Sequence, residues 1–201
     1  PSYTFVSTVN AFALRGAKIV FADSCANHPN IDPDQIESLI TKRTKAIVVV
    51  HYAGVACDMD RIMAISECHG VPVVEDAAQA LGATIKNIQV GLFGGIGVFS
   101  LGATKIITSG GQGGIIISKN RDISDLARKI RDYDSIVDTI PRFNFQMTDI
   151  QAAIAREQLK KLPEFIFRRA EIFKKYQSAG LPLIDNTDKD IKPVRFRAVL
   201  L

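Results

Sequence analysis

Short apolar runs alternate with amphipathic stretches along the first half of the chain. Residues 17–22, 44–51 and 71–76 are rich in valine, isoleucine and alanine, which is typical of strands buried within a sheet. Helices are predicted between them, over residues 34–40 and 59–69. Strands that alternate with helices at this spacing favour an α/β fold, in which right-handed βαβ units build a mainly parallel sheet covered by helices.

Both predicted helices carry end signals. Asp32 and Pro33 offer an N-cap and a first-turn proline to the first helix. Asp58 is the predicted cap of the second helix, and Gly70 is its predicted stop. These signals support helices at the two positions that the hydrophobic pattern indicates.

Glycine-punctuated strands and longer helices are predicted in the second half. The strands cover residues 97–100 and 114–118. The helices cover residues 122–132, 147–162 and 164–179, and the last of these is charged on one side, as a long connecting helix would be. We expect a large domain over residues 1–162, and the connecting helix with the start of a smaller domain over residues 163–201.

The two ends of the sequence suggest a fragment. The chain opens on Pro1 without an initiator methionine. Residues 194–201 alternate in polarity like a strand cut off in mid-course. We therefore expect a fragment of a longer chain.

Composition narrows the class of protein. The 201 residues are 47% hydrophobic and 23% charged, as in a globular chain with one sizeable core. The net charge of +4 comes without a basic run, so neither a nucleic acid nor another polyanion is a predicted partner. The most apolar run, residues 46–57, is shorter than the roughly 20 residues of a membrane-spanning helix. Three cysteines without a CxxC pair fit a reducing compartment, so we expect a cytoplasmic protein.

Asp76 is the first residue with candidate chemistry. It ends a predicted parallel strand, and in open α/β sheets ligands bind outside the carboxyl ends of the strands. Gln79 follows three residues later. The alternative reading of Asp76 is a helix cap.

Lys105 is the second residue with candidate chemistry. It follows the predicted strand at residues 97–100 among small residues, where partial desolvation can lower the pKa of its amine and make it a nucleophile. The alternative is a solvated surface charge. Asp76 and Lys105 together favour a catalytic site over the two alternatives, because each follows a predicted strand of the same α/β unit. A pyridoxal-phosphate enzyme needs such a pair: a lysine to hold the aldehyde and a carboxylate to keep the pyridine nitrogen protonated.

Around these residues the sequence resembles the DegT/StrS-type sugar aminotransferases, which share the type I aminotransferase fold. The similar motifs occur in the family's order, at residues 1–8, 14–18, 51–57 and 75–79. The resemblance runs from the first residue to about residue 180. It implies pyridoxal 5'-phosphate as cofactor and a truncated large domain, because the family's first phosphate-binding turn would lie upstream of Pro1.

The resemblance implies specific roles near the cofactor. Lys105 would be the catalytic Schiff-base lysine, and Asp76 the catalytic partner of the pyridinium nitrogen. Gln79 would lie near the cofactor's phenolic oxygen, and the Ser100 hydroxyl would bind its phosphate.

Two further roles concern the cofactor's faces and the neighbouring subunit. Phe5 takes the place of an aromatic residue that stacks on the cofactor ring. Asn144 resembles an asparagine that reaches the phosphate of the neighbouring subunit's cofactor, which implies a homodimer with shared active sites. The chain departs from the family pattern at Leu101, Gly102 and Ile106, where a Phe-His pair and an asparagine are usual.

The activity implied by the resemblance is transfer of an amino group from glutamate to a nucleotide-linked keto-sugar, such as dTDP-4-keto-6-deoxyglucose. Such a reaction serves amino-sugar and polysaccharide biosynthesis, including that of lipopolysaccharide. Two alternatives stay open. The first is a non-catalytic truncated remnant acting in dimerisation or regulation, which the departures at Gly102 and Ile106 support. The second is a doubly wound nucleotide-binding protein without pyridoxal phosphate.

No metal site is predicted. His51, Cys57, Cys68 and His69 could be imagined as zinc ligands, but they include no compact pair such as CxxC or HxxxH. The chain also lacks a GxGxxG motif, which weakens a dinucleotide-dependent dehydrogenase.

Overall fold

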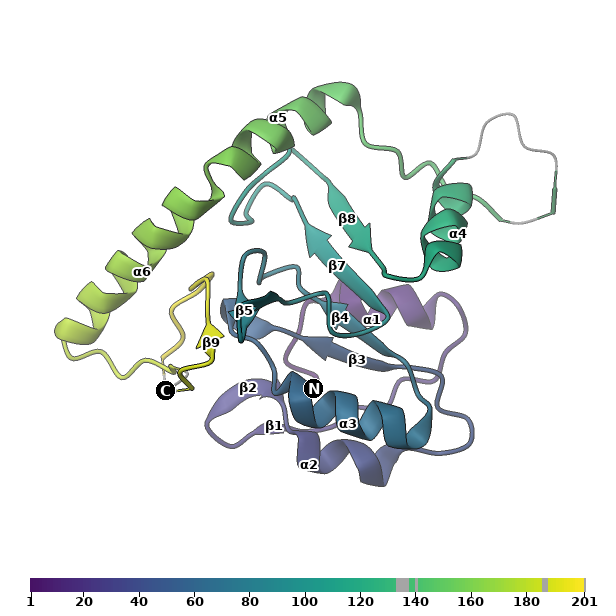
Figure 1. Cartoon of the computed structure of the whole chain (residues 1–201), viewed down its shortest axis with the longest axis horizontal. Coiled ribbons are helices and arrows are strands. Elements are labelled where there is room, and N and C mark those ends of the chain that lie inside the picture. Colours follow the sequence, from purple (N-terminus) through teal and green to yellow (C-terminus); the bar gives the residue numbers. More distant parts are fainter. Residues whose placement is uncertain (133–137, 140, 186–187, 201) are drawn as a thin grey trace.

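A four-stranded sheet lies at the centre of the computed structural model, which describes residues 1–132, 138–139, 141–185 and 188–200 (Figure 1). Its strands run in the order β3 (Ile47–Val50), β4 (Val73–Asp76), β7 (Ile96–Ser100) and β8 (Gly114–Ile117). The first three are parallel, and β8 pairs antiparallel with β7. The predicted α/β fold with a mainly parallel sheet is confirmed.

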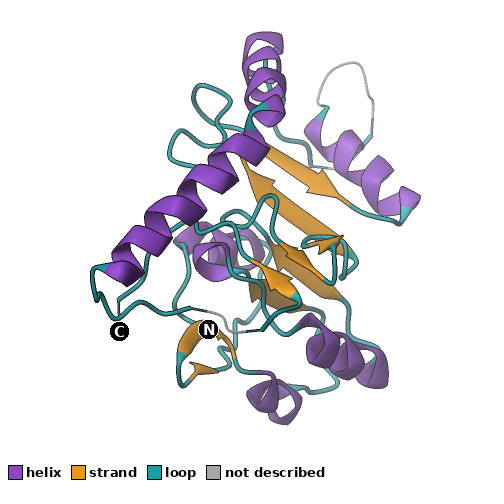
Figure 2. Ribbon diagram, turned by 60° about the vertical axis from the view of Figure 1, so that its left-hand side comes forward, coloured by secondary structure: helices purple, strands orange, loops and turns teal. Residues whose placement is uncertain are grey.

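Helices cover both sides of this sheet (Figure 2). Before β3 lie α2 (Pro33–Ile36) and a 3-10 turn (Glu37–Leu39), and α3 (Met59–His69) connects β3 to β4. In Figure 1, α3 lies in front of β3, while α1 (Val6–Ala13) lies behind the sheet.

The predicted helix signals are present in the structure. The Asp32 side chain accepts a hydrogen bond from the Asp34 amide, and the Asp58 side chain accepts one from the Arg61 amide. Gly70 ends α3 in the left-handed region, with φ 63°.

The chain then leaves the four-stranded sheet and returns to a separate, smaller sheet. After α4 (Arg121–Arg131), α5 (Asp149–Lys160) and α6 (Leu162–Ser178) form a long arm along one side of the molecule (Figure 1). The returning segment, residues 188–200, contains β9 (Ile191–Lys192), which pairs with β5 (Thr84–Ile85).

Small antiparallel pairs complete the fold. β5 also pairs with β6 (Ile88–Gln89), and β1 (Ser24–Cys25) pairs with β2 (His28–Ile31) near the start of the chain.

The core lies between the sheet and its covering helices. β3, β4 and β7 contribute Val49, Val73 and Phe99, and α3 contributes Met59 and Ile62, all of them buried. Burying an apolar side chain of this size stabilises the fold by about 1.5–3 kcal/mol. This core fixes the strand ends at which the candidate site residues lie.

Two sequence predictions were wrong, and one helix was missed. Residues 17–22 are extended but belong to no strand within the described part of the chain. Residues 194–200 form no strand either, apart from a single bridge between Leu183 and Leu200, and Leu201 lies outside the described residues. Helix α1 was not predicted, because its N-cap Phe5 makes no side-chain capping bond and none of its residues is buried.

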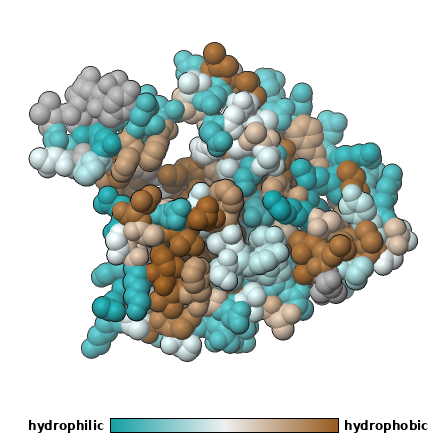
Figure 3. Space-filling view, turned by 180° about the vertical axis from the view of Figure 1, so that it is seen from behind, coloured by the Kyte–Doolittle hydropathy of each residue, from teal (hydrophilic) through white to brown (hydrophobic). Residues whose placement is uncertain are grey.

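The rear face carries exposed apolar side chains. Val6, Leu14, Val20 and Phe21 on α1 and the extended segment after it are 49–85% exposed. Figure 3 views the molecule from behind and shows hydrophobic side chains gathered on this side. No helix within the described ranges is long and apolar enough to cross a membrane.

Candidate active site

The carboxyl ends of β3, β4 and β7 meet at one edge of the sheet, because these strands are parallel. Val50 pairs with Asp76, and Asp76 pairs with Val98 on the next strand. Ser100 ends β7, and Lys105 lies on the loop that follows. The structure therefore brings the predicted residues Asp76, Ser100 and Lys105 to the same edge.

Two hydrogen bonds hold the Asp76 carboxylate. The Thr8 hydroxyl on α1 donates to Oδ2 over 2.6 Å, and the Ala78 amide donates to Oδ1 over 3.0 Å. A second hydroxyl, that of Thr4, lies 3.1 Å from the Thr8 hydroxyl. Because each carboxylate oxygen has two lone pairs, Asp76 can accept a further donor.

Lys105 is held by its loop. Its amide donates to the Gly102 carbonyl over 3.0 Å, and the next residues, Ile106 and Ile107, are buried in the core. Its Nζ lies 5.3 Å from the centroid of the Phe196 ring.

Burial lowers the pKa of the Lys105 amine from its ordinary value of 10.5. The Asp76 carboxylate acts in the opposite direction and raises this pKa, and the Arg197 guanidinium lowers it further. The amine thus lies within electrostatic reach of both groups, and more of it is neutral at a given pH than for an exposed lysine.

Gln79 and Ser100 border the same edge. Gln79 is 9% exposed, and its Oε1 accepts the Ala53 amide over 2.9 Å. The Ser100 hydroxyl oxygen accepts the Gly102 amide over 3.3 Å. A Cβ added at Gly102 would lie 3.5 Å from Ser100 Oγ and 3.9 Å from Lys105 Cγ, which are ordinary van der Waals contacts.

The other two predicted residues are placed differently. Phe5 is 66% exposed at the N-cap of α1, one turn before Thr8. Asn144 is exposed on the segment between α4 and α5, and within the described residues no contact joins it to Lys105 or Asp76. Its predicted contact with a neighbouring subunit remains a prediction.

The departures from the family pattern have structural explanations. Leu101 and Ile106 are 2% and 8% exposed and belong to the hydrophobic core, so they pack beneath the site. Gly102 forms an isolated bridge with Gly111. A Cβ at this position would make only ordinary van der Waals contacts with Ser100 and Lys105, so a methyl group fits there without a clash.

Sequence reasoning missed the contribution of the returning segment. The Val194 amide donates to the Gly54 carbonyl, and the Arg197 amide donates to the Ala53 carbonyl. These bonds bring Phe196 to Lys105. No local sequence signal predicts this contact, because the returning segment lies far from Lys105 along the chain.

The four residues considered as zinc ligands, His51, Cys57, Cys68 and His69, do not form one cluster. His51 and Cys57 are buried, and the His51 ring donates from Nε2 to Glu75 Oε2 over 3.0 Å while its Nδ1 accepts the Cys57 amide. Cys68 and His69 are exposed at the end of α3. Their ligand atoms lie near those of Glu37, whose Oε1 is 2.7 Å from His69 Nε2.

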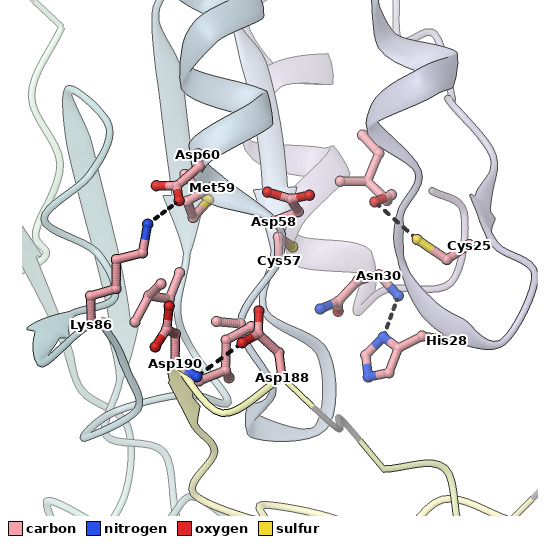
Figure 4. Close-up of a pocket in the computed structure, with 14 residues that line it drawn as sticks. Cys25, His28, Asn30, Cys57, Asp58, Met59, Asp60, Lys86, Asp188 and Asp190 are labelled. Atoms are coloured by element: carbon pink, nitrogen blue, oxygen red, sulfur yellow. Dashed lines mark hydrogen bonds and ion pairs between the residues drawn. The ribbon is translucent and has the colours of Figure 1, made fainter.

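A separate hollow of about 310 Å³ lies beside β2, the start of α3 and β9 (Figure 4). Polar side chains around it are already engaged: Lys86 Nζ donates to Asp60 over 2.6 Å, and His28 Nδ1 accepts the Asn30 amide. None of the predicted site residues lines this hollow.

Known proteins resemble the chain over most of its length. A family model described as the DegT/DnrJ/EryC1/StrS aminotransferase family matches residues 1–189. A DegT DnrJ EryC1 StrS aminotransferase from Brucella abortus is 27% identical, with a TM-score of 0.91 over 98% of this chain and 57% of the other.

Two further solved structures are similar. PseC of Helicobacter pylori, an aminotransferase of pseudoaminic acid biosynthesis, is 29% identical with a TM-score of 0.90, over 97% of this chain and 55% of the other. DesI, solved in the presence of its TDP-sugar product, is 29% identical with a TM-score of 0.89, over 98% of this chain and 52% of the other. The chain spans a little over half the length of these proteins. It belongs to the DegT/DnrJ/EryC1/StrS aminotransferase family, whose members depend on pyridoxal phosphate.

Proposed function

We propose that the protein transfers an amino group from an amino acid, glutamate, to a nucleotide-linked keto-sugar such as dTDP-4-keto-6-deoxyglucose. The observation that carries the proposal is the common position of Lys105 and Asp76. The Lys105 amine and the Asp76 carboxylate lie at one edge of the sheet, and the carboxylate acts on the pKa of the amine.

The residues at this edge fit pyridoxal phosphate. Lys105 offers the aldehyde an amine whose pKa burial lowers, and Asp76 retains acceptor capacity for a protonated ring nitrogen. The Ser100 hydroxyl oxygen accepts the Gly102 amide, and its own hydrogen can donate to a phosphate oxygen. When bound, the cofactor withdraws electrons from the carbon that loses its proton.

Each residue then has a definite task. Lys105 Nζ accepts the proton from the donor's α-carbon and holds it for return, which its lowered pKa favours. Asp76 keeps a proton on the ring nitrogen through its charge. Thr8 and the Ala78 amide keep the carboxylate in place for this task.

Substrate, assembly and location follow from the same proposal. A nucleotide sugar as acceptor is supported by DesI, which was solved with a TDP-sugar product. A homodimer with shared active sites is supported by the exposed apolar side chains around α1 and the exposed position of Asn144. We also propose a cytoplasmic enzyme of amino-sugar biosynthesis, with a large domain over residues 1–162 and the connecting helix with the start of a smaller domain over residues 163–201.

Cofactor attachment tests this function. Pyridoxal phosphate added to the purified protein should produce a visible absorption band that borohydride abolishes, and peptide mass spectrometry should locate the reduced adduct at Lys105. Lys105→Ala should show no band, whereas the exposed-lysine control Lys119→Ala should retain it. A colourless wild-type protein would favour the non-catalytic remnant instead.

A further inference from the structure

Three cationic side chains surround the ring of Phe196. Lys105 Nζ lies 5.3 Å from the ring centroid, and the Cζ atoms of Arg197 and Arg169 lie 5.6 Å and 5.9 Å from it. Cations gather at an aromatic face because its quadrupole attracts them. The two arginines also line a hollow of about 260 Å³ together with Tyr176 and Arg195.

Arg197 differs from the other arginines of this hollow in its partners. Arg195 pairs with Asp185 and stacks on the Phe173 ring at 4.0 Å, and Arg169 donates to the Phe196 carbonyl over 3.1 Å. Within the described part of the chain, no carboxylate lies within 4.0 Å of the exposed Arg197 guanidinium. Its donors are thus available to a ligand.

The backbone ties Arg197 to the candidate active site. Its amide donates to the Ala53 carbonyl over 3.4 Å, and the Ala53 amide donates to Gln79 Oε1 over 2.9 Å. Gly54 permits this close approach, because a Cβ there would lie 2.9 Å from the Phe196 nitrogen and 2.7 Å from Val194 Cγ2. The positive charge of Arg197 reaches Lys105, whose pKa it helps to lower.

We propose that Arg197 binds a carboxylate of the amino-acid donor and so holds the donor beside the Lys105 amine. The inference rests on the proposed aminotransferase function. A planar guanidinium matches a carboxylate in a two-point hydrogen bond. One available guanidinium can neutralise the single negative charge of a carboxylate. The diphosphate of a nucleotide sugar carries at least two negative charges and would need a further cation. The carboxylate is either the α-carboxylate or that of the donor's side chain.

Kinetics of substituted proteins test the assignment. Arg197→Ala should raise the KM for glutamate roughly ten- to a hundredfold, the effect of one lost hydrogen-bonded charge pair. The KM for the nucleotide sugar should stay within about twofold of the wild-type value. Arg197→Lys should recover part of the loss, and Arg168→Ala, which removes an exposed arginine of α6, should change neither constant. An alanine donor separates the two carboxylates: an equal loss with alanine assigns the α-carboxylate, and a loss confined to glutamate assigns that of the side chain.

A binding measurement separates this inference from the enzyme's activity. Glutarate, a dicarboxylate without an amine, should bind the wild-type protein by calorimetry and raise the pKa of Lys105, and neither effect should occur in Arg197→Ala. If Arg197→Ala instead raises the KM for the nucleotide sugar, or leaves the KM for glutamate and the binding of glutarate unchanged, Arg197 is not the donor anchor. The function itself is judged separately: Arg197→Ala should retain the borohydride-sensitive band, and a wild-type protein without that band refutes the function.

Discussion

The hydroxyl of Thr8 donates to Oδ2 of Asp76 over 2.6 Å and so ties helix α1 to the end of β4. The two residues lie far apart in sequence, and the bond joins the N-terminal segment to the edge at which Lys105 lies. The Ala78 amide holds the other carboxylate oxygen. The orientation of Asp76 thus depends on α1 as well as on its own strand.

Replacing Thr8 tests this positioning role. Thr8→Val keeps the side-chain shape but removes the donor, and a hydrogen bond to a charged group contributes about 1.5–3 kcal/mol. We expect kcat to fall roughly ten- to a hundredfold. Thr8→Ser, which retains the hydroxyl, should recover most of the rate. Ser7→Ala, an exposed change in the same helix, is the control; an equal loss there would indicate a general effect of α1.

The reactivity of Lys105 should depend on pH in a defined direction. Because burial lowers the pKa of this amine, it should react with an acylating reagent at a lower pH than the exposed Lys42 does. Asp76→Asn removes the charge that raises this pKa and should lower it further, while Arg197→Ala should raise it. Peptide mass spectrometry across a pH series measures the reactivity of Lys105 in the wild type, Asp76→Asn and Arg197→Ala. A reactivity profile unaffected by either substitution would contradict the electrostatic coupling.

Much of the fold was predictable because its signals are local. The helix caps Asp32 and Asp58 and the stop at Gly70 are encoded within a few residues, and the structure agrees with them. Residues 17–22 show the limit: their apolar pattern predicts a strand, but a strand also needs a neighbour to pair with, and within the described ranges they pair with none.

The candidate site was predictable only in part, for a similar reason. The position of Asp76 and Ser100 at one edge follows from parallel strands, whose carboxyl ends coincide. The approach of Arg197 to Lys105 depends on how the chain returns after α6, which no local pattern specifies. Thr8 lies within a recognised motif, but its partner Asp76 is known only from the fold.

Glu75 should be the most important buried charge for stability. It is 0% exposed, and its carboxylate accepts hydrogen bonds from His51 Nε2 and the amides of Gly91, Phe93 and Gly94. Burial alone would raise the pKa of Glu75, but the bonds from His51, Gly94 and Gly91 outweigh it and hold the pKa below 4.5. Glu75→Gln turns an amide group toward these donors and should lower the free energy of unfolding by about 3–5 kcal/mol.

The wild-type protein and Glu75→Gln should also differ in how their stability depends on pH. A carboxylate whose pKa is lower when folded stabilises the fold above its unfolded pKa, and this contribution is lost as pH falls through the folded value. The wild-type protein should therefore lose stability below about pH 4.5, and Glu75→Gln should lack this component of the loss. Urea unfolding at several pH values measures it. The exposed Glu67→Gln should behave like the wild type, and an unchanged acid slope in Glu75→Gln would assign the loss to other carboxylates.

Two glycines with the same backbone conformation should respond differently to alanine. Gly16 and Gly54 have φ of 78° and 83°, so alanine at either position costs about 1–2 kcal/mol in the left-handed region. A Cβ at Gly16 meets nothing within 4 Å, whereas at Gly54 it would lie 2.7 Å from Val194 Cγ2. Gly54→Ala should therefore cost roughly 1–3 kcal/mol more than Gly16→Ala in urea unfolding, because the returning segment must move. Since that segment carries Arg197, Gly54→Ala should also weaken the binding of glutarate while Gly16→Ala leaves it unchanged; equal effects of the two changes would mean that the returning segment does not depend on the space at Gly54.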